Sequence, residues 1–244
     1  MNVITNVRID QVRMDEQNDQ LELKLNNGQT LNTDICIVDV GSEPNIDIAK
    51  SAGFEIDPIN GGLVANSELQ IRSNIWAAGD VVSFYDRKHG RRRDYHHDNA
   101  IYTGRLAGDN ASISHTGKPG KQYSHNARFW SDLGADIGFE AIGMIDSRLS
   151  TFAMFAKSDN QDNDNDDDQY KYERGVLFYL NNTNIVGIIL WNIFDVDNMH
   201  IARRILTHNN NNENNNDLNE MARLFSIYPS PPMAVEGDNN DKMN

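Results

Sequence analysis

Apolar and polar residues alternate over the first part of the chain in the manner of β-strands. The alternation predicts strands over residues 3–12 and 21–25, each with one apolar face. The dipeptide Asn27-Gly28, which separates two apolar runs, predicts a hairpin turn. The continuous apolar run 34–40 predicts a buried strand that ends at Gly41. The opening of the chain is therefore expected to be a small β-sheet.

The next stretch predicts a helix and then a strand that ends in a carboxylate. A short helix is expected over residues 45–52, ended by Gly53, and the alternating stretch 55–72 predicts a hairpin. The apolar run 75–80 predicts a buried parallel strand with Asp80 at its carboxyl end, where open α/β sheets bind ligands. A carboxylate there accepts hydrogen bonds from sugar or ribityl hydroxyls. The alternative is a buried strand that ends in an ordinary turn aspartate.

A polar loop with a concentrated basic cluster, Lys88 to Arg93, is predicted after Asp80. The cluster is interpreted first as a solvated loop. A nuclear-import signal and an anion contact are the two alternatives.

A helix is predicted from about residue 98 to residue 110, with Asp98 or Asn99 as the N-cap. His96 and His97 precede it. Because these histidines are adjacent, their side chains diverge, whereas a two-histidine metal site on a helix requires i, i+4 spacing. One structural and one ligand-facing histidine are expected instead of a metal site.

A Ser/Gly/Lys/Pro linker over residues 111–125 is expected to lead to a second domain near Ala127. Within it, Trp130 is either a core residue or a ring that stacks on an aromatic cofactor, and Glu140 is a solvated strand residue. Strands are predicted over residues 137–145 and 151–156, and a hairpin pairs residues 175–180 with 185–191. Two helices are predicted over residues 198–206 and 217–225.

Two polar segments interrupt this second domain. The aspartate-rich residues 158–170 are expected to form a disordered acidic loop. Calcium binding there is disfavoured because the glycine and the terminal glutamate of an EF-hand are absent. Residues 207–216 are asparagine-rich and carry no core-forming content.

Composition narrows the function. The 244 residues carry a formal net charge of −14, which argues against a general nucleic-acid-binding surface. No apolar run approaches the roughly 20 residues that a transmembrane helix needs, and the first six residues are typical of neither a signal peptide nor a transit peptide. Because Cys36 is the only cysteine, a disulfide, a CxxC pair and a cysteine-rich zinc site are excluded, and any redox chemistry requires a bound cofactor.

Several motifs carry a specific resemblance. The segment Val38 to Asn45 resembles the strand-G-x-x-P-N junction of flavoproteins with two dinucleotide-binding domains, and Ile75 to Asp80 resembles their second flavin signature. The stretches NIWAAGD, FYDRKHGRRR, HHDNAIYTGRLAGDN, FWSDLGADIGFEAIG and GIILWNIF closely resemble the apoptosis-inducing factor family of mitochondrial flavoproteins. The likeness runs from about Gly28 to Phe225 and covers only the C-terminal portion of such a protein.

The resemblance implies a fold class that combines α/β and α+β parts. Residues 1–41 are similar to the end of the NADH-binding domain of a pyridine nucleotide-disulfide reductase-like protein. Residues 42–125 are similar to the second segment of its FAD-binding domain. Residues 126–244 are similar to the family's C-terminal dimerisation-like α+β domain.

The resemblance also implies a function and a set of partners. It implies an FAD-dependent enzyme of the mitochondrial intermembrane space that takes hydride from NADH, dimerises when reduced and supports respiratory-chain maintenance through the disulfide-relay import oxidoreductase. During caspase-independent cell death such a protein moves to the nucleus and binds DNA. By this resemblance Lys88 to Arg93 match its nuclear-import segment.

The cofactor residues follow from matched positions. Asp80 matches the family's flavin ribityl contact, His96 and His97 match its histidine pair at the flavin, and Trp130 matches an aromatic ring near the isoalloxazine and the nicotinamide. Gly41 and Glu140 match nicotinamide-nucleotide contacts. The sequence departs from the pattern in two places, where Tyr95 replaces an acidic residue and Asp195 replaces an asparagine.

No GxGxxG motif occurs in the sequence, so the residues that would hold a pyrophosphate on a helix N-terminus are missing. The polypeptide by itself is therefore expected to bind FAD weakly or not at all and not to be a competent oxidase. Two alternatives are a non-redox binding or signalling module, made of the C-terminal domain and the basic loop, and another reductase of the ferredoxin or rubredoxin type. The FWSDLG segment and the Asp-rich insertion argue against the second.

Overall fold

The computed structural model of the chain describes residues 2–134, 137–156, 173–208, 217–225 and 227. The chain divides into two compact units, Met1–Glu43 and Pro44–Asn244. Each is described by itself. The predicted acidic loop over residues 158–170 and the asparagine-rich residues 209–216 lie outside the described residues.

The first unit is a three-stranded antiparallel sheet of β1 (Ile9–Asp15), β2 (Gln20–Leu25) and β3 (Thr30–Thr33). The predicted hairpin turn is confirmed. Gly28 adopts a left-handed φ of 87°, and its N–H donates to Leu25 O at 3.0 Å. The first strand begins at Ile9 and not at residue 3 as predicted. Leu23 and Leu25 of β2 are the buried side chains of this sheet.

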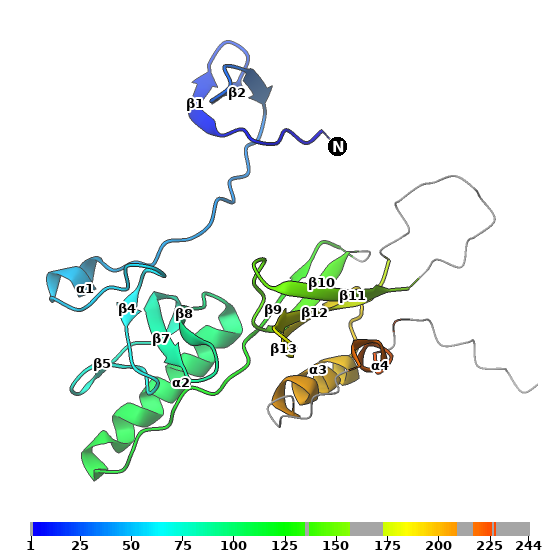
Figure 1. The fold of residues 1–244 in the computed structure, drawn as a ribbon. Helices are drawn as coiled ribbons and strands as arrows, with labels where there is room; N and C mark the ends of the chain where they lie inside the picture. Colours follow the sequence, from blue (N-terminus) through cyan, green and yellow to red (C-terminus); the bar gives the residue numbers. More distant parts are fainter. Residues whose placement is uncertain (1, 135–136, 157–172, 209–216, 226, 228–244) are drawn as a thin grey trace, which may run out of the picture. The chain divides into compact units, whose positions relative to one another are not determined.

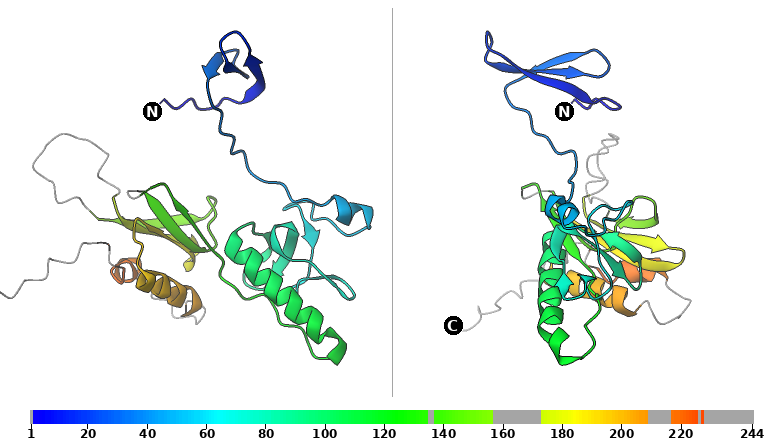
Figure 2. Two further views of the ribbon diagram at one scale, coloured as in Figure 1. Left: turned by 180° about the vertical axis from the view of Figure 1, so that it is seen from behind. Right: turned by 90° about the vertical axis from the view of Figure 1, so that its left-hand side faces the viewer.

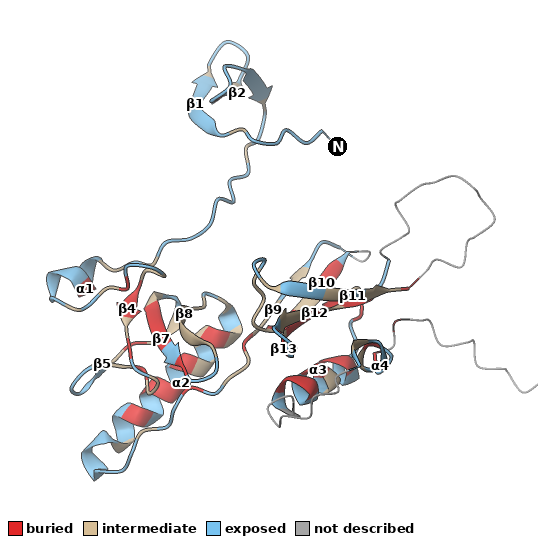
Figure 3. Ribbon diagram, in the orientation of Figure 1, coloured by how far each residue is buried: buried red, intermediate tan, exposed pale blue. Residues whose placement is uncertain are grey.

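The predicted buried strand over residues 34–40 is wrong. No strand forms there, and Ile37 and Val40 are 91% and 88% exposed. A buried parallel strand needs a hydrogen-bonded neighbour on its sheet and a covering layer on each face. No described residue of the first unit supplies either to this segment, which is mostly exposed (Figure 3), so an apolar run alone did not make a strand.

The second unit begins with helix α1 (Asp47–Ser51), which ends as predicted at Gly53. Gly53 N donates to Lys50 O and Phe54 N donates to Ala49 O, which is the pair of bonds of a Schellman motif.

Small sheets follow helix α1 (Figure 1). Strand β4 (Leu63–Val64) pairs in parallel with β7 (Val82–Asp86), which pairs antiparallel with β8 (Gly90–Arg93). Strands β5 (Gln70–Arg72) and β6 (Ile75–Trp76) form a separate antiparallel pair.

The strand predicted over residues 75–80 is also wrong. Only Ile75–Trp76 is a strand, and Gly79–Val81 is a 3-10 turn, η1. The parallel strand lies one step later, in β7, where Val82 and Phe84 are fully buried. The polar loop predicted after Asp80 is therefore replaced by a β-hairpin whose first strand carries the apolar residues of the core.

Helix α2 (His97–Ile113) packs one face against this core and is followed by the 3-10 turn η2 (Ser114–Thr116). The segment predicted as a linker does not leave the surface of the helix. Asn110 Nδ2 donates to Glu68 O and Lys121 O, and the 2% exposed Tyr123 donates its hydroxyl to Asn99 Oδ1 at 2.9 Å. These buried polar bonds bind the segment to α2, which the low-complexity composition did not predict.

The C-terminal part is a five-stranded antiparallel sheet in the order β11-β12-β13-β10-β9. Its strands are β9 (Arg128–Asp132), β10 (Gly138–Gly143), β11 (Ser150–Phe155), β12 (Gly175–Asn181) and β13 (Asn184–Trp191). Helices α3 (Val196–His208) and α4 (Leu218–Ala222) cover one face of it (Figures 1 and 2). The predicted strands, the hairpin and both helices are confirmed.

The core of this part lies between the sheet and the two helices, where Phe178, Ile188 and Leu190 are fully buried. The capping box predicted for α4 forms in part, because the Asp217 side chain accepts hydrogen bonds from Asn219 N and Glu220 N.

Two glycines face each other where β10 crosses β13, since Gly143 pairs in register with Gly187. A Cβ atom on Gly143 would overlap Val186 O, and one on Gly187 would overlap Met144 O. Gly143 also has a left-handed φ of 86°. The two backbones therefore approach too closely at this point for any side chain.

Candidate functional site

The basic cluster does not form a solvated loop. Its three arginines lie on β8, and each is half-buried and bonded within the chain. Arg91 Nη1 donates to Ala65 O and Ser83 O, at 3.0 and 2.7 Å. Arg93 Nε donates to Asn60 O at 2.9 Å. The prediction failed because the paired strand β7, which supplies partners to this segment, was itself interpreted as a loop.

Arg92 is the most enclosed of the three. Its guanidinium pairs with Asp86 Oδ2 at 3.1 Å, while the side chains are only 17% and 5% exposed. It also lies over the rings of Phe84 and Tyr123, at 5.2 and 5.6 Å from their centroids. Burial among these groups raises the pKa of the Tyr123 phenol well above its ordinary range, so the hydroxyl stays protonated.

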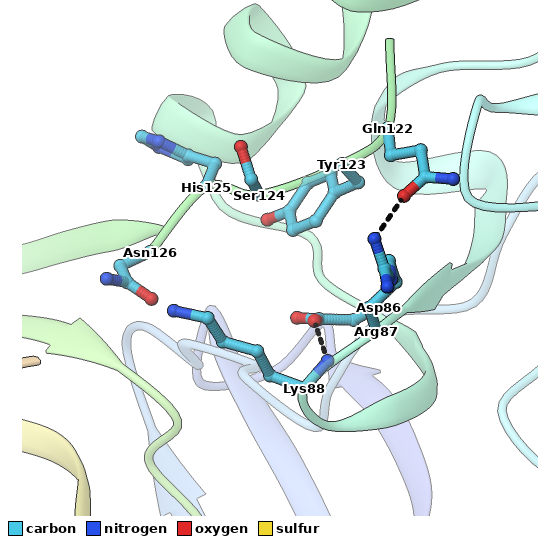
Figure 4. A pocket seen from close by; sticks show the side chains of 8 residues that line it. All are labelled: Asp86, Arg87, Lys88, Gln122, Tyr123, Ser124, His125 and Asn126. Carbon is cyan, nitrogen blue, oxygen red and sulfur yellow. Dashed lines mark hydrogen bonds between the residues drawn. The ribbon is translucent and has the colours of Figure 1, made fainter. Parts of the chain in front are cut away.

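The turn that leads into β8, Asp86 to Lys88, lines a cavity of about 390 Å³ (Figure 4). Arg87 donates to Gln122 Oε1 at 2.9 Å across it, and Lys88 N donates to Asp86 Oδ1. The Arg87 and Lys88 side chains are exposed. The cationic groups that remain accessible are therefore at the turn and not on the arginine strand.

The two histidines lie at the beginning of α2. His96 occupies the N-cap position, and its N–H donates to Asp94 Oδ1. The prediction that Asp98 or Asn99 caps the helix is wrong. The Asp98 carboxylate instead accepts from a different part of the chain, 27 and 30 residues away.

Each histidine ring meets an aromatic ring of β9. The His96 ring stacks on Phe129, with centroids 4.1 Å apart and planes 7° apart. The exposed His97 ring lies edge-on to Trp130 at 6.4 Å. The divergence of the two histidines, which was predicted from their adjacency, gives each a separate aromatic partner.

Asp80 lies in the turn η1 next to the first turns of α2. Gly79 N donates to Thr103 Oγ1 at 2.9 Å, and Arg93 Nη1 donates to Asp80 O at 3.2 Å. The Asp80 side chain is exposed. Gly79 has a left-handed φ of 77°, and a Cβ atom there would meet only Ala100 Cβ at 4.0 Å. Open space beside a glycine and an exposed carboxylate is an arrangement in which a ligand can approach the backbone.

Trp130 and Glu140 are cross-strand neighbours on β9 and β10. The Trp130 side chain is 46% exposed, and the Arg128 guanidinium lies 5.4 Å from its ring. Arg128 Nη1 is also 3.7 Å from Glu140 Oε1, an ion pair that was not predicted. Beside it is a cavity of about 230 Å³, which Asp195 also lines.

The structure thus brings Asp80, His96 and His97 to one helix end, and places Trp130 and Glu140 beside it through the contact of β9 with α2. Gly41 belongs to the first unit, where it is exposed with a left-handed φ of 95°. Among the described residues no group of three or more histidine, cysteine, aspartate or glutamate side chains is arranged to hold a metal ion. None of the described helices is long and apolar enough to cross a membrane.

Sequence reasoning missed three residues of this region: Thr103, His125 and Arg128. Thr103 is the side chain that holds Gly79 N, and its hydroxyl donates to Asn99 O. A buried threonine one turn into a helix is a weak signal without the fold. His125 lay inside the presumed linker, where its composition gave no reason to select it.

The beginning of α2 gathers several groups that a ligand can contact. An exposed acceptor-only carboxylate, a glycine with open space and an exposed indole surround a helix N-terminus whose partial positive charge favours an anionic ring. The fold is that of the pyridine nucleotide-disulphide oxidoreductase class. The profile described as Pyridine nucleotide-disulphide oxidoreductase matches residues 1–104.

Solved structures of other proteins have a similar fold. A ferredoxin reductase from Rhodopseudomonas palustris superposes with a TM-score of 0.61 at 23% identity, over 81% of this chain and 43% of the other. An NAD-dependent persulfide reductase from A. fulgidus superposes with a TM-score of 0.61 at 18% identity, over 84% of this chain and 38% of the other. At these identities the likeness establishes the fold alone.

The remaining residues identify the family within this class. A second profile, Apoptosis-inducing factor, mitochondrion-associated, C-term, matches residues 107–169 and 159–208. Apoptosis-inducing factor 1, mitochondrial, of Dictyostelium discoideum is 42% identical over 193 residues, 78% of this chain and 35% of that protein. A Drosophila melanogaster relative, also named as an apoptosis-inducing factor 1, mitochondrial, is 40% identical over 93% of this chain and 34% of that protein. The chain belongs to the apoptosis-inducing factor family and spans about a third of the length of these relatives.

Proposed function

We propose that this chain forms the part of an FAD-dependent NADH oxidoreductase that holds the middle and the ring end of the flavin. The observation that carries the proposal is the meeting of η1, the beginning of α2 and β9, with Gly79 N bonded to Thr103 and His97 edge-on to Trp130. In this assignment Asp80 accepts hydrogen bonds from the ribityl hydroxyls. His96, His97 and Trp130 lie beside the isoalloxazine ring.

Burial and charge support the assignment. Trp130 is 46% exposed although an indole buries a large apolar area when it is covered, so a planar ligand would gain by stacking on it. The N-terminus of α2 carries partial positive charge, and the acidic residue of its first turn, Asp98, is bonded to His125 and to Arg128 N. It would therefore stabilise negative charge on a reduced ring by its dipole.

NADH is proposed as the second ligand, with Glu140 contacting the nicotinamide nucleotide. When bound, the flavin supplies the hydride acceptor, and the residues of this chain orient the ring and tune its surroundings electrostatically. Arg128, which pairs with Glu140 and covers part of Trp130, holds both side chains in place beside the cavity. No side chain is required as a nucleophile.

The cellular role is proposed from the family. It comprises respiratory-chain maintenance in the mitochondrial intermembrane space, a reduction-dependent homodimer, the disulfide-relay oxidoreductase as partner, and nuclear translocation with DNA binding in cell death. The relatives' printed names support the mitochondrial part.

The test is a titration of the isotopically labelled chain with riboflavin and with FAD, followed by the indole N–H resonances of its tryptophans. The Trp130→Phe variant assigns the Trp130 signal, and adenosine diphosphate, which lacks the ring, is the control ligand. Because the sequence contains no GxGxxG motif, we expect binding to be weak, and both flavins to shift the Trp130 signal at high concentration and leave the Trp191 signal unchanged. A Trp130 signal that does not respond to either flavin at its highest soluble concentration would contradict the proposal.

A further inference from the structure

One carboxylate joins helix α2 to the C-terminal sheet. Asp98, in the first turn of α2, accepts two hydrogen bonds on the same oxygen, Oδ2. His125 Nε2 lies 2.6 Å from it, and Arg128 N donates to it at 2.9 Å. The side chains of Asp98 and His125 are only 26% and 20% exposed. His125 lies shortly before strand β9, and Arg128 is its first residue.

The position of this bond determines which rings meet. Arg128 is the first residue of β9, so fixing its N–H next to Asp98 also fixes the two residues that follow. Phe129 then stacks on His96 and Trp130 meets the edge of His97. Successive strand residues point to opposite faces, so a slip of one residue would exchange the two rings.

His125 is itself held from the other side. Its ring stacks on Tyr102, with centroids 4.3 Å apart and planes 10° apart, and Tyr102 is one helical turn beyond Asp98. Burial alone would raise the pKa of Asp98, but the hydrogen bonds from His125 and from Arg128 N outweigh it and hold that pKa below its ordinary value. The carboxylate is therefore ionised and bonded at neutral pH.

We infer that Asp98 is a positioning residue for the candidate site: its carboxylate, bonded to His125 and Arg128 N, sets the register of β9 on α2 and so places Phe129 and Trp130 against His96 and His97. The inference rests on the proposed function only in what the placement is for, namely holding these rings beside a flavin. It does not require Asp98 to contact a ligand.

The experiment compares Asp98→Asn with Asp109→Asn in the whole 244-residue chain. Asp109 is a matched control because it also lies on α2 and pairs with the segment that follows the helix, through Lys121, but both side chains are more than half exposed. The readout is the set of nuclear Overhauser effects between the rings of His96 and Phe129 and of His97 and Trp130, measured without any flavin. We expect Asp98→Asn to weaken both sets severalfold and Asp109→Asn to leave both unchanged.

Ring-to-ring effects that persist in Asp98→Asn would overturn the inference. Should that variant lose its helical circular dichroism, Asp98→Ala, which removes both hydrogen bonds and introduces a strong helix former, gives the same decision, since unchanged ring contacts there also overturn the inference. Because the measurement uses no cofactor, its outcome is separate from the flavin titration. A chain that loses its ring contacts in Asp98→Asn but does not bind flavin refutes the proposed function alone.

Discussion

Replacing Asp57 by asparagine should destabilise the first half of the second unit by a predictable amount. Asp57 is 4% exposed, and its carboxylate accepts four hydrogen bonds. They come from Ser83 Oγ at 2.5 Å, from Ile59 N, and from the backbone N–H and the Nδ2 of Asn60. Ser83 lies on β7, so this carboxylate fixes the central strand of the sheet. Asn60 O in turn accepts from Arg93, whose Nη1 reaches Asp80 O.

The magnitude follows from the pKa. Burial would raise the pKa of Asp57, but the hydrogen bonds from Ser83, Asn60 and Ile59 outweigh it and lower the pKa from 3.8 to about 2. One pKa unit corresponds to about 1.36 kcal/mol, so the ionised carboxylate contributes on the order of 2 kcal/mol. Because the folded pKa is the lower one, this contribution is present above about pH 4 and is lost as the pH falls through about 2.

The assay is urea unfolding of Asp57→Asn, followed by the fluorescence of Trp76, which packs against this core. The tryptophans Trp130 and Trp191 are replaced by phenylalanine in both chains so that only this signal remains. We expect the variant to be about 2 kcal/mol less stable at pH 7, and the difference to shrink towards zero near pH 2.

Asp146→Asn is the control. The pKa of Asp146 is also lowered to about 2, chiefly by its hydrogen bond from Arg148, but the Arg148 side chain is 86% exposed. Solvent screening leaves such a surface pair worth about 0.5 kcal/mol or less. Equal stability of Asp57→Asn and the parent chain at pH 7, or a difference that does not diminish in acid, would refute the reasoning.

Three further substitutions test the packing around the site. Phe178→Ala, at a fully buried ring against Phe225, should cost about 3–5 kcal/mol in urea unfolding of the C-terminal part, and a cost under 1 kcal/mol would contradict the assigned core. Arg92→Met should cost about 3–5 kcal/mol because it leaves the Asp86 carboxylate buried without its ion partner, and the loss should diminish in the Arg92→Met/Asp86→Leu double variant. Tyr123→Phe, which removes only the hydroxyl bonded to Asn99, should cost about 1 kcal/mol, and a neutral result would indicate that water replaces that bond.

The parts of the fold that could be predicted from the sequence are those that carry local signals. The turn at Gly28 needs a left-handed residue, and the α4 helix needs a side-chain cap, which Asp217 provides. The hairpin of β12 and β13 needs only two apolar runs and a polar turn. In each case the residues that determine the structure are neighbours in the sequence.

The parts that failed depend on partners far away in the chain. Residues 34–40 are as apolar as a buried strand but lack a neighbouring strand among the described residues. Val82 to Asp86 form the central strand because β4, about twenty residues earlier, pairs with them. Arg91 is half-buried because carbonyl oxygens 26 and 8 residues away accept its protons. A window of about 11–18 residues does not contain both strands of the β4–β7 pair or both Arg91 and Ala65.

The candidate site shows the same division. The matched motifs indicated Asp80, His96, His97 and Trp130, and the structure brings them to one end of α2. The motifs did not indicate Asp98, because its carboxylate was interpreted as a helix cap. A cap and a long-range acceptor require the same residue type, and only the fold distinguishes them.

The facing pair Gly143 and Gly187 limits how this sheet can diversify. Any substitution at either glycine would place a methyl group against the backbone of the opposite strand, so the middle of the sheet is closed to change at that point. The residues that follow Gly143 lead directly to the loop at Asp146 beside the arginine strand β8. New binding properties of this domain would therefore have to arise in that loop or along the outer strands.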